Sequence, residues 1–171
     1  MNIFALDSDP RLAARYHCDR HVVKMVLETA QLLSTALWNA CPAEARRLSG
    51  AGLAYRPTHA RHPCSLWLLE SAANVRWLAR LGLALADEYE HRYPGKVHAS
   101  RGVIEACTEA FRLAFSERRC AIPKGARPTR FVQAMPAQHR REDPVEGYRT
   151  YYREAKAHLA RWTHRRRPPW F

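Results

Sequence analysis

The chain lacks a hydrophobic run long enough to cross a membrane, since no stretch approaches the roughly 18 unbroken apolar residues that a spanning helix needs. Its opening residues, MNIFALDSDP, carry acidic side chains and no Lys or Arg, so we expect no export signal there. Cysteines are few and no CxxC pair occurs. The five are Cys18, Cys41, Cys64, Cys107 and Cys120. An odd number of scattered cysteines without an export signal is typical of reduced thiols. We therefore expect a soluble, cytoplasmic protein that does not bind membranes.

Acidic residues are also scarce, because 16 Asp and Glu face 28 Lys and Arg, which gives a formal net charge of +12. A positive excess of this size is usually met by a polyanion, and nucleic acid is the commonest one. Hydrophobic residues make up 47% of the chain, which excludes a wholly disordered basic tail. The predicted partner is therefore nucleic acid, and a basic protein without a dedicated ligand is the alternative.

The sequence has no Asn-Gly hairpin signal, no regular series of alternating short strands and no internal repeat. These absences, with the helical spacing of apolar residues, predict a compact all-α domain over residues 1–171. Helices are expected near residues 10–16, 20–40, 63–92 with an interruption, 98–115 and 144–163. Asp19 is the expected cap of the second helix, and Pro63 and Pro144 suit first turns. NIFAL is the one candidate strand, and long loops are expected at 41–62 and 116–143.

Two segments concentrate the positive charge. The loop at 116–143 contains three prolines, and between positions 118 and 141 it carries seven basic side chains and no acidic one. Arg127 and Arg130 in this loop are candidate nucleic-acid contacts. The tail at 164–171 adds arginines before two prolines, a Trp and a Phe. Both segments suit contacts with a phosphate backbone.

The predicted helix at 20–40 carries a single line of polar residues on an otherwise apolar surface. Its members are spaced 4, 3, 4, 3 and 4 residues apart, so they share one face: His17, His21, Lys24, Glu28, Gln31 and Thr35. Polar groups on a buried helix are costly unless they meet water, partners or substrate. The line therefore predicts a cleft, and the alternative is a solvent face with a Lys24–Glu28 ion pair.

Further candidate binding residues lie in two turns and one helix. His59 and His62 precede a predicted helix start, whose free N–H groups suit an anion. Lys96 and His98 stand beside a glycine turn before another helix. Four more polar or aromatic candidates follow from helical spacing or from neighbouring turns: Tyr55, Trp67, Glu70 and Asn74. Tryptophans at helical spacing are more often core residues than base-stacking platforms.

A metal site is a weaker alternative. His17, Asp19 and His21 supply ligand types at close spacing, but the string has no second half at a recognised distance, and Asp19 is also the expected cap. We expect no cofactor and no metal.

The Asp-x-His at the helix start, with Glu28 seven residues after His21, resembles the corresponding stretch of the phage pyrimidine-dimer DNA glycosylases. The turn from Tyr55 to Pro63 is similar to one in their bacterial relatives, and the wider pattern looks like uncharacterised phage and bacterial proteins. The resemblance implies that Glu28 is the catalytic carboxylate and His21 the neighbouring histidine. It also implies an N-terminal amine nucleophile exposed by removal of Met1. Asn2 is too large a second residue for efficient removal of Met1, so Lys24 becomes the substitute amine.

The sequence thus predicts a nucleic-acid enzyme, with DNA favoured by the resemblance, that cleaves an N-glycosidic bond. Glu28 would stabilise a cationic sugar, His21 would give the leaving base a proton, and Lys24 would hold phosphate or act as amine. Gln31 and Asn74 would read base edges, while Trp67 and Tyr55 would fill the space of an exposed base. A metal-dependent hydrolase, a base-modifying transferase and a non-enzymatic DNA- or RNA-binding protein remain alternatives. The oligomeric state stays open.

Overall fold

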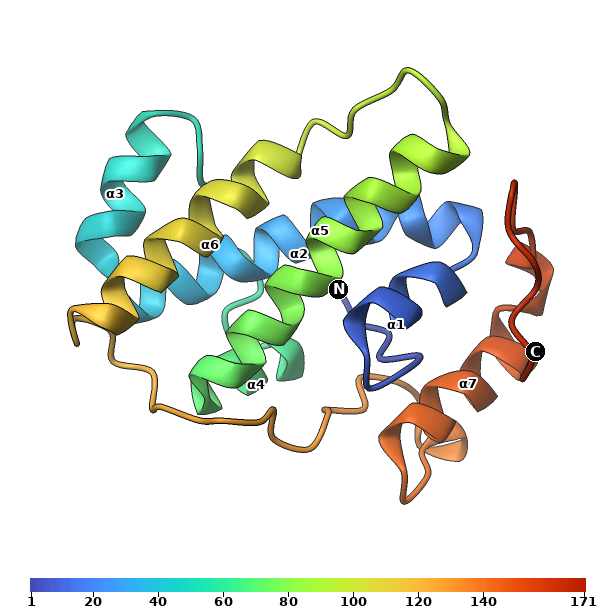
Figure 1. The fold of residues 1–171 in the computed structure, drawn as a ribbon. Coiled ribbons are helices and arrows are strands. Elements are labelled where there is room, and N and C mark those ends of the chain that lie inside the picture. The colour runs from blue at the N-terminus through green and yellow to red at the C-terminus, as the bar shows by residue number, and fades with distance from the viewer.

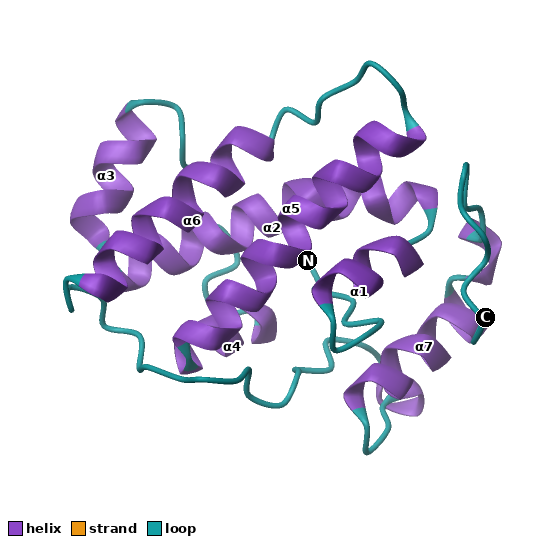
Figure 2. Cartoon of the chain, viewed as in Figure 1, coloured by secondary structure: helices purple, strands orange, loops and turns teal.

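Helices and loops make up the whole structure, a computed structural model that describes residues 1–171 (Figures 1 and 2). The α-helices are α1 (Pro10–Tyr16), α2 (Asp19–Ala40), α3 (Pro42–Gly50), α4 (Pro63–Glu70), α5 (Ala72–Arg92), α6 (Arg101–Ser116) and α7 (Pro144–Ala155). Two short 3-10 helices also occur: η1 (Ala137–His139) precedes α7, and η2 (Ala157–Leu159) follows it. The predicted all-α fold is confirmed.

Helix boundaries follow local capping chemistry. Pro63 and Pro144 occupy first turns as predicted, and the Asp143 side chain caps α7 by accepting the N–H of Val145. The expected interruption of 63–92 falls at Ser71, whose extended backbone ends α4 and whose hydroxyl caps α5. Asp19 does not cap α2, because the N-cap is Cys18 and the Asp19 carboxylate binds other groups.

Four predictions of secondary structure were wrong. The predicted loop at 41–62 contains α3, which begins with proline at its first turn and is rich in alanine and arginine, both good helix formers. NIFAL forms no strand, since the structure contains no second strand to pair with it. Helix α6 starts at Arg101 rather than 98. Helix α7 ends at Ala155, where the predicted helix ran to 163.

Helix α2 is the centre of the packing. It lies against α5, α6, α3 and α4, while α1 lies against α5. Forty buried residues form one continuous hydrophobic core. None of the helices combines the length and the apolar character that crossing a membrane requires.

Two irregular segments pass along this helical body. Residues 1–6 run into the interior beside α2, and residues 2–6 are buried. The loop at 117–143 leaves α6, passes below α4 in the view of Figure 1 and reaches α7. It is tied to α4 and α5 through Thr129, and to the N-terminal segment through the carbonyl of Ala134. The loop therefore brings the second half of the chain to the start of the first.

Candidate active site

Glu28 lies where the N-terminal segment meets α2. Its Oε2 accepts the backbone N–H of Asn2 at 2.8 Å and lies 3.8 Å from the α-amino group of Met1. Its Oε1 lies 3.5 Å from Nζ of Lys24, one turn earlier on the helix. The residue is only 7% exposed, whereas the Lys24 side chain is 68% exposed. One N–H donor and two nearby cations hold this carboxylate in one orientation.

Packing holds the N-terminal segment in place. Phe4 has a φ of 35°, a left-handed conformation that is strained for a residue other than glycine and that persists only where the surroundings fix it. Its ring stacks on His21 with a centroid separation of 4.5 Å and an interplanar angle of 22°. The Asn2 side chain donates to the carbonyl of Ala134 at 2.9 Å. The position of the α-amino group beside Glu28 is therefore set by contacts on both sides.

His62 shares the electrostatic surroundings of Glu28. It is the N-cap of α4, where its Nδ1 accepts the N–H of Cys64 at 3.2 Å. Burial lowers the pKa of His62, the positive α-amino group and His59 lower it further, and Glu28 opposes them. Burial raises the pKa of the neighbouring Cys64 thiol to about 12, so this cysteine stays protonated.

His21 lies apart from Glu28. The two residues are separated by two helical turns, or about 10 Å along the axis at 1.5 Å per residue. Burial lowers the pKa of His21 to about 4, and positive charges on Lys156, Lys24 and His158 act in the same direction. At neutral pH the ring is therefore uncharged. His21 as proton donor to the leaving base stays a prediction, and the donor would be a neutral ring.

The candidate metal ligands have other partners. His17 is buried at the end of α1, not on α2, and its Nδ1 hydrogen-bonds the carbonyl of Ala13 at 2.7 Å. Asp19 binds Arg92 and Thr163, and His21 binds Tyr152. In the structure no group of three or more His, Cys, Asp or Glu side chains is placed to hold a metal ion. His17, Asp19 and His21 are thus not brought together as a set of ligands, because each side chain is already bound within the fold.

Trp67 and Asn74 are core residues. Trp67 packs against Phe131 and Trp77. The Asn74 amide nitrogen donates to the carbonyl of Trp67 at 2.6 Å and to the Thr129 hydroxyl at 2.8 Å, and its oxygen accepts the Thr129 N–H at 2.8 Å. These bonds fix the long loop to the helices. The predicted contacts of Trp67 and Asn74 with a base are therefore not available in this structure.

The other candidates lie around α2 without forming one cluster. Nε2 of His98 hydrogen-bonds the carbonyl of Val23 at 3.0 Å, and the Tyr55 hydroxyl bonds Ser100 at 3.1 Å. His59 bonds Thr58, whose backbone is held by Thr35. Gln31 is half-buried, while the basic candidates Lys96, Arg127 and Arg130 are exposed. The Arg130 guanidinium also donates to the carbonyl of Glu142.

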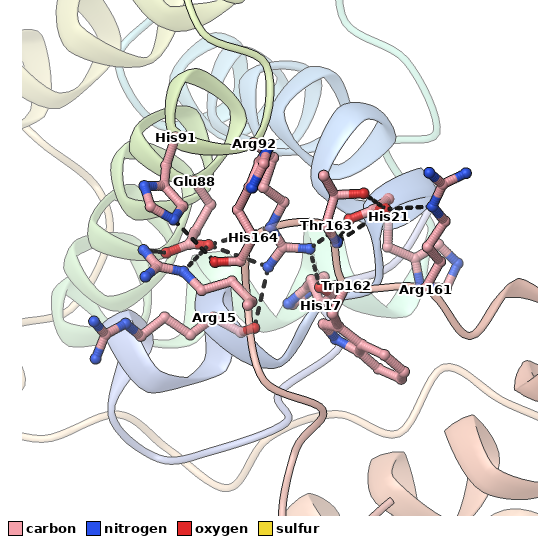
Figure 3. A network of polar contacts seen from close by, with 12 residues as sticks. Arg15, His17, His21, Glu88, His91, Arg92, Arg161, Trp162, Thr163 and His164 are labelled. Carbon is pink, nitrogen blue, oxygen red and sulfur yellow. Dashed lines mark hydrogen bonds and ion pairs between the residues drawn. The ribbon is translucent and has the colours of Figure 1, made fainter.

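A buried ion network beside His17 and His21 joins the C-terminal segment to the helices (Figure 3). The Arg92 guanidinium is fully buried and donates to Glu88, to Asp19 and to the carbonyls of His17 and Arg15. Arg165 adds two hydrogen bonds to Glu88, at 3.0 and 2.8 Å. Burial raises the pKa of Glu88, but Arg165 and Arg92 outweigh it, so the net pKa is lowered.

Asp19 completes this network from the α2 side. Its carboxylate accepts the backbone N–H and the hydroxyl of Thr163, the latter at 2.7 Å. Its own N–H donates to the carbonyl of Arg161 at 2.9 Å. The tail that was expected to contact phosphate is thus partly committed to the protein itself. No local pattern in the sequence predicts these contacts, because Arg92 and Thr163 lie 73 and 144 residues from Asp19.

A hollow of about 990 Å³ lies between α1, α5 and α6, away from Glu28. Charged residues of both signs line it, among them Arg11, Arg80, Asp87 and Glu105. None of the predicted site residues contributes to it. It does not correspond to the cleft that was expected along the polar line of α2.

Comparison with known proteins adds one finding. No curated protein and no solved structure matches the chain. A family model described as pyrimidine dimer DNA glycosylase matches residues 1–99. This match covers more than half of the 171 residues, including the N-terminal segment, Glu28 and His62, and the chain therefore belongs to the pyrimidine dimer DNA glycosylase family.

Proposed function

We propose that this chain is a DNA N-glycosylase that removes a damaged or modified pyrimidine, with Glu28 as its catalytic carboxylate. The observation that carries the proposal is the convergence of the Met1 α-amino group, the Asn2 N–H and Lys24 on one nearly buried carboxylate. Family membership supports DNA as the substrate. The net charge of +12 supports binding to a polyanion.

The reaction breaks the bond between C1′ of the sugar and the base nitrogen, and the electron pair leaves with the base. Positive charge develops on the sugar, so a fixed carboxylate at Glu28 stabilises the transition state. A nucleophile forms the new bond to C1′, and Glu28 would accept its proton. The Met1 α-amino group is 3.8 Å and Lys24 Nζ 3.5 Å from the carboxylate, so both amines are candidates beside water.

Glu28→Gln tests the carboxylate. The amide keeps the shape but removes the charge, so turnover of a duplex with a single pyrimidine dimer should fall about 100-fold or more, with affinity maintained. Glu70→Gln is the matched control, because Glu70 is an exposed glutamate that hydrogen-bonds Thr129. Single-turnover cleavage and equilibrium binding are measured on the same duplex. Equal cleavage rates for wild type and Glu28→Gln would refute the proposal.

Reduction with borohydride during turnover identifies the nucleophile. An amine that bonds to C1′ forms an imine once the sugar ring opens, and reduction makes that bond permanent. Peptide mapping then separates an adduct on the N-terminal peptide from one on Lys24. Cleavage without any adduct would indicate water. Binding without cleavage by the wild type would favour the non-enzymatic alternative.

A further inference from the structure

Two cysteines meet where the end of α2 lies beside the start of the loop that follows α6 (Figure 1). Cys41 stands between α2 and α3, and Cys120 lies four residues after the last residue of α6. The N–H of Ala121 donates to the carbonyl of Ala40 at 3.4 Å. This hydrogen bond joins the peptide group just before Cys41 to the one just after Cys120. Standard backbone dimensions then place the two α-carbons within about 8 Å of each other.

Contacts of the neighbouring side chains hold the two segments together. The Arg119 guanidinium lies 3.3 Å from the carboxylate of Glu44 on α3. Each thiol of Cys41 and Cys120 lies within hydrogen-bonding reach of the other. The remaining three cysteines are buried, and one of them, Cys107, hydrogen-bonds the Ser34 hydroxyl at 3.7 Å. The fold therefore brings two thiols side by side at a position that is distant in sequence for both.

The two thiols differ in their access to solvent. Cys120 is half-buried, whereas Cys41 is only 5% exposed, so a small oxidant reaches Cys120 first. The hydrogen bond between the thiols lowers the pKa of Cys120 to about 7, although burial opposes this shift, and it raises the pKa of Cys41. The charged groups at the pair are Glu44 and Arg119. The accessible sulfur is thus a thiolate in part at neutral pH, which is the nucleophilic form of a cysteine.

We propose that Cys41 and Cys120 form a thiol pair that a peroxide oxidises to an intramolecular disulfide. The Cys120 thiolate attacks one oxygen of hydrogen peroxide, the O–O bond breaks, and the hydroxide that leaves takes up a proton to become water. The sulfur of Cys41 then attacks the sulfur of the Cys120 sulfenic acid and gives up its own proton, while the S–O bond breaks and a second water leaves. The two thiols lose two electrons in total, and the peroxide gains them.

This disulfide would tie the start of the long loop to the end of α2. It would close a ring of about 80 residues, and a cross-link over so long a segment stabilises a fold chiefly by restricting the unfolded chain. The carbonyl of Pro123, three residues further along the loop, accepts the N–H of Ala72 at 2.8 Å. The loop start is therefore already placed against the helices before the bond forms. The chemistry at Glu28 takes no part in this proposal, which stands or falls independently of the glycosylase activity.

Peptide mapping of the wild-type chain tests the pair directly and needs no variant. The reduced protein is treated with hydrogen peroxide at neutral pH, alkylated in denaturant and digested with trypsin without reduction. Trypsin leaves Cys41 on peptide 25–46 and Cys120 on peptide 120–124, and neither peptide contains another cysteine. We expect these two peptides to be linked and the other three cysteines to be alkylated. Alkylation of all five cysteines, or a disulfide from either residue to another cysteine or to a second chain, would overturn the proposal.

Single substitutions test the order of the two steps. Cys120→Ser should abolish the linked peptides, whereas the matched control Cys107→Ser should retain them. With dimedone present as a trap for sulfenic acid, Cys41→Ser should be labelled at Cys120, and Cys120→Ser should be labelled at Cys41 at least about tenfold more slowly. Equal or reversed labelling rates would refute Cys120 as the residue that peroxide attacks.

Thermal unfolding tests whether the fold holds the two thiols in a geometry that suits a disulfide. The oxidised wild type should unfold about 5 °C or more above the reduced protein. Cys120→Ser should unfold at the same temperature before and after peroxide treatment, which controls for oxidation elsewhere in the chain. A lower unfolding temperature for the oxidised wild type would mean that the bond distorts the native structure, and would contradict the proposed pairing.

Discussion

His17 and His21 are buried imidazoles whose ionisation is coupled to folding. Burial lowers the pKa of His17 to about 3 and that of His21 to about 4, from a usual value of 6.5. Between these folded values and 6.5 the unfolded chain binds more protons than the folded one. The free energy of unfolding therefore rises with pH through this window. The contribution of the two rings is complete above pH 6.5 and is lost as the pH falls below it.

This coupling predicts loss of stability in weak acid. Each ring should cost about 2 kcal/mol of unfolding free energy between pH 8 and pH 5. Urea titrations at both pH values measure the difference for the wild type, for His21→Gln and for His158→Gln. The His21 variant should lose about 2 kcal/mol of the pH dependence, whereas the exposed His158 should contribute little. An unchanged pH dependence in His21→Gln would show that His21 is not a buried neutral ring.

Helices α2 and α5 approach closely because Gly82 of α5 has no side chain where it faces Thr29 of α2. A Cβ placed on Gly82 would lie 2.4 Å from Cγ2 of Thr29 and 3.1 Å from Cδ1 of Ile104. Thr29 is buried and β-branched, so its methyl group has little freedom to move. The close contact also sets where α2 lies, and with it the position of Glu28.

Gly82→Ala should therefore destabilise the fold by about 2 kcal/mol, through overpacking between α2 and α5. Gly102→Ala is the matched control, since Gly102 lies in α6 and a Cβ added there would meet no atom within 4 Å. That control should be neutral or gain about 0.5 kcal/mol from reduced backbone entropy in the unfolded chain. Chemical unfolding of both variants measures the difference. Equal stabilities would mean that α2 and α5 can separate without cost.

The elements that sequence could predict are those with local signals. Pro63, Pro144 and the apolar spacing of α2 located helices correctly, while α3 was missed although proline and alanine marked it. The polar line of α2 led to Glu28 but also to Thr35, which is buried against the backbone of Thr58. Spacing defines a face of a helix, but which neighbour covers that face depends on contacts distant in sequence.

The contacts of the candidate site also show that a sequence predicts local pairs but not contacts between distant residues. Glu28 and Lys24 are one turn apart, so their pairing follows from helix geometry alone. The α-amino group of Met1 and the hydroxyl of Tyr152 reach α2 only through the tertiary fold. The resemblance implied a nucleophile at the N-terminus, and the size of Asn2 argued against removal of Met1. In the structure, the backbone N–H of Asn2 donates to Glu28.

Across the whole molecule, the positive charge divides into cations bound within the fold and cations on the surface. Arg92 and Arg165 are paired with Glu88, and Arg149 is paired with Asp7. Lys124 and Arg127 in the long loop are exposed. Ion pairs within the fold remove cations and acids together, so the net excess remains on cations without an acidic partner. Because Arg165 of the tail is paired with Glu88, the loop is the better candidate for phosphate contacts.

The salt dependence of DNA binding measures how many of the surface cations contact phosphate. If about six phosphates are contacted, log K should fall with log salt with a slope of roughly −5 on duplex DNA. Replacing both Lys124 and Arg127 by Gln should bring the slope to roughly −3, because each lost phosphate contact removes about 0.9. Arg112→Gln is the control, since Arg112 is on α6 and paired with Glu109, so its slope should stay near the wild-type value. Binding that is indifferent to salt would refute the electrostatic interface. A double variant with the wild-type slope would instead move the phosphate contacts away from the loop, to cations such as Lys24 and Lys156 beside α2.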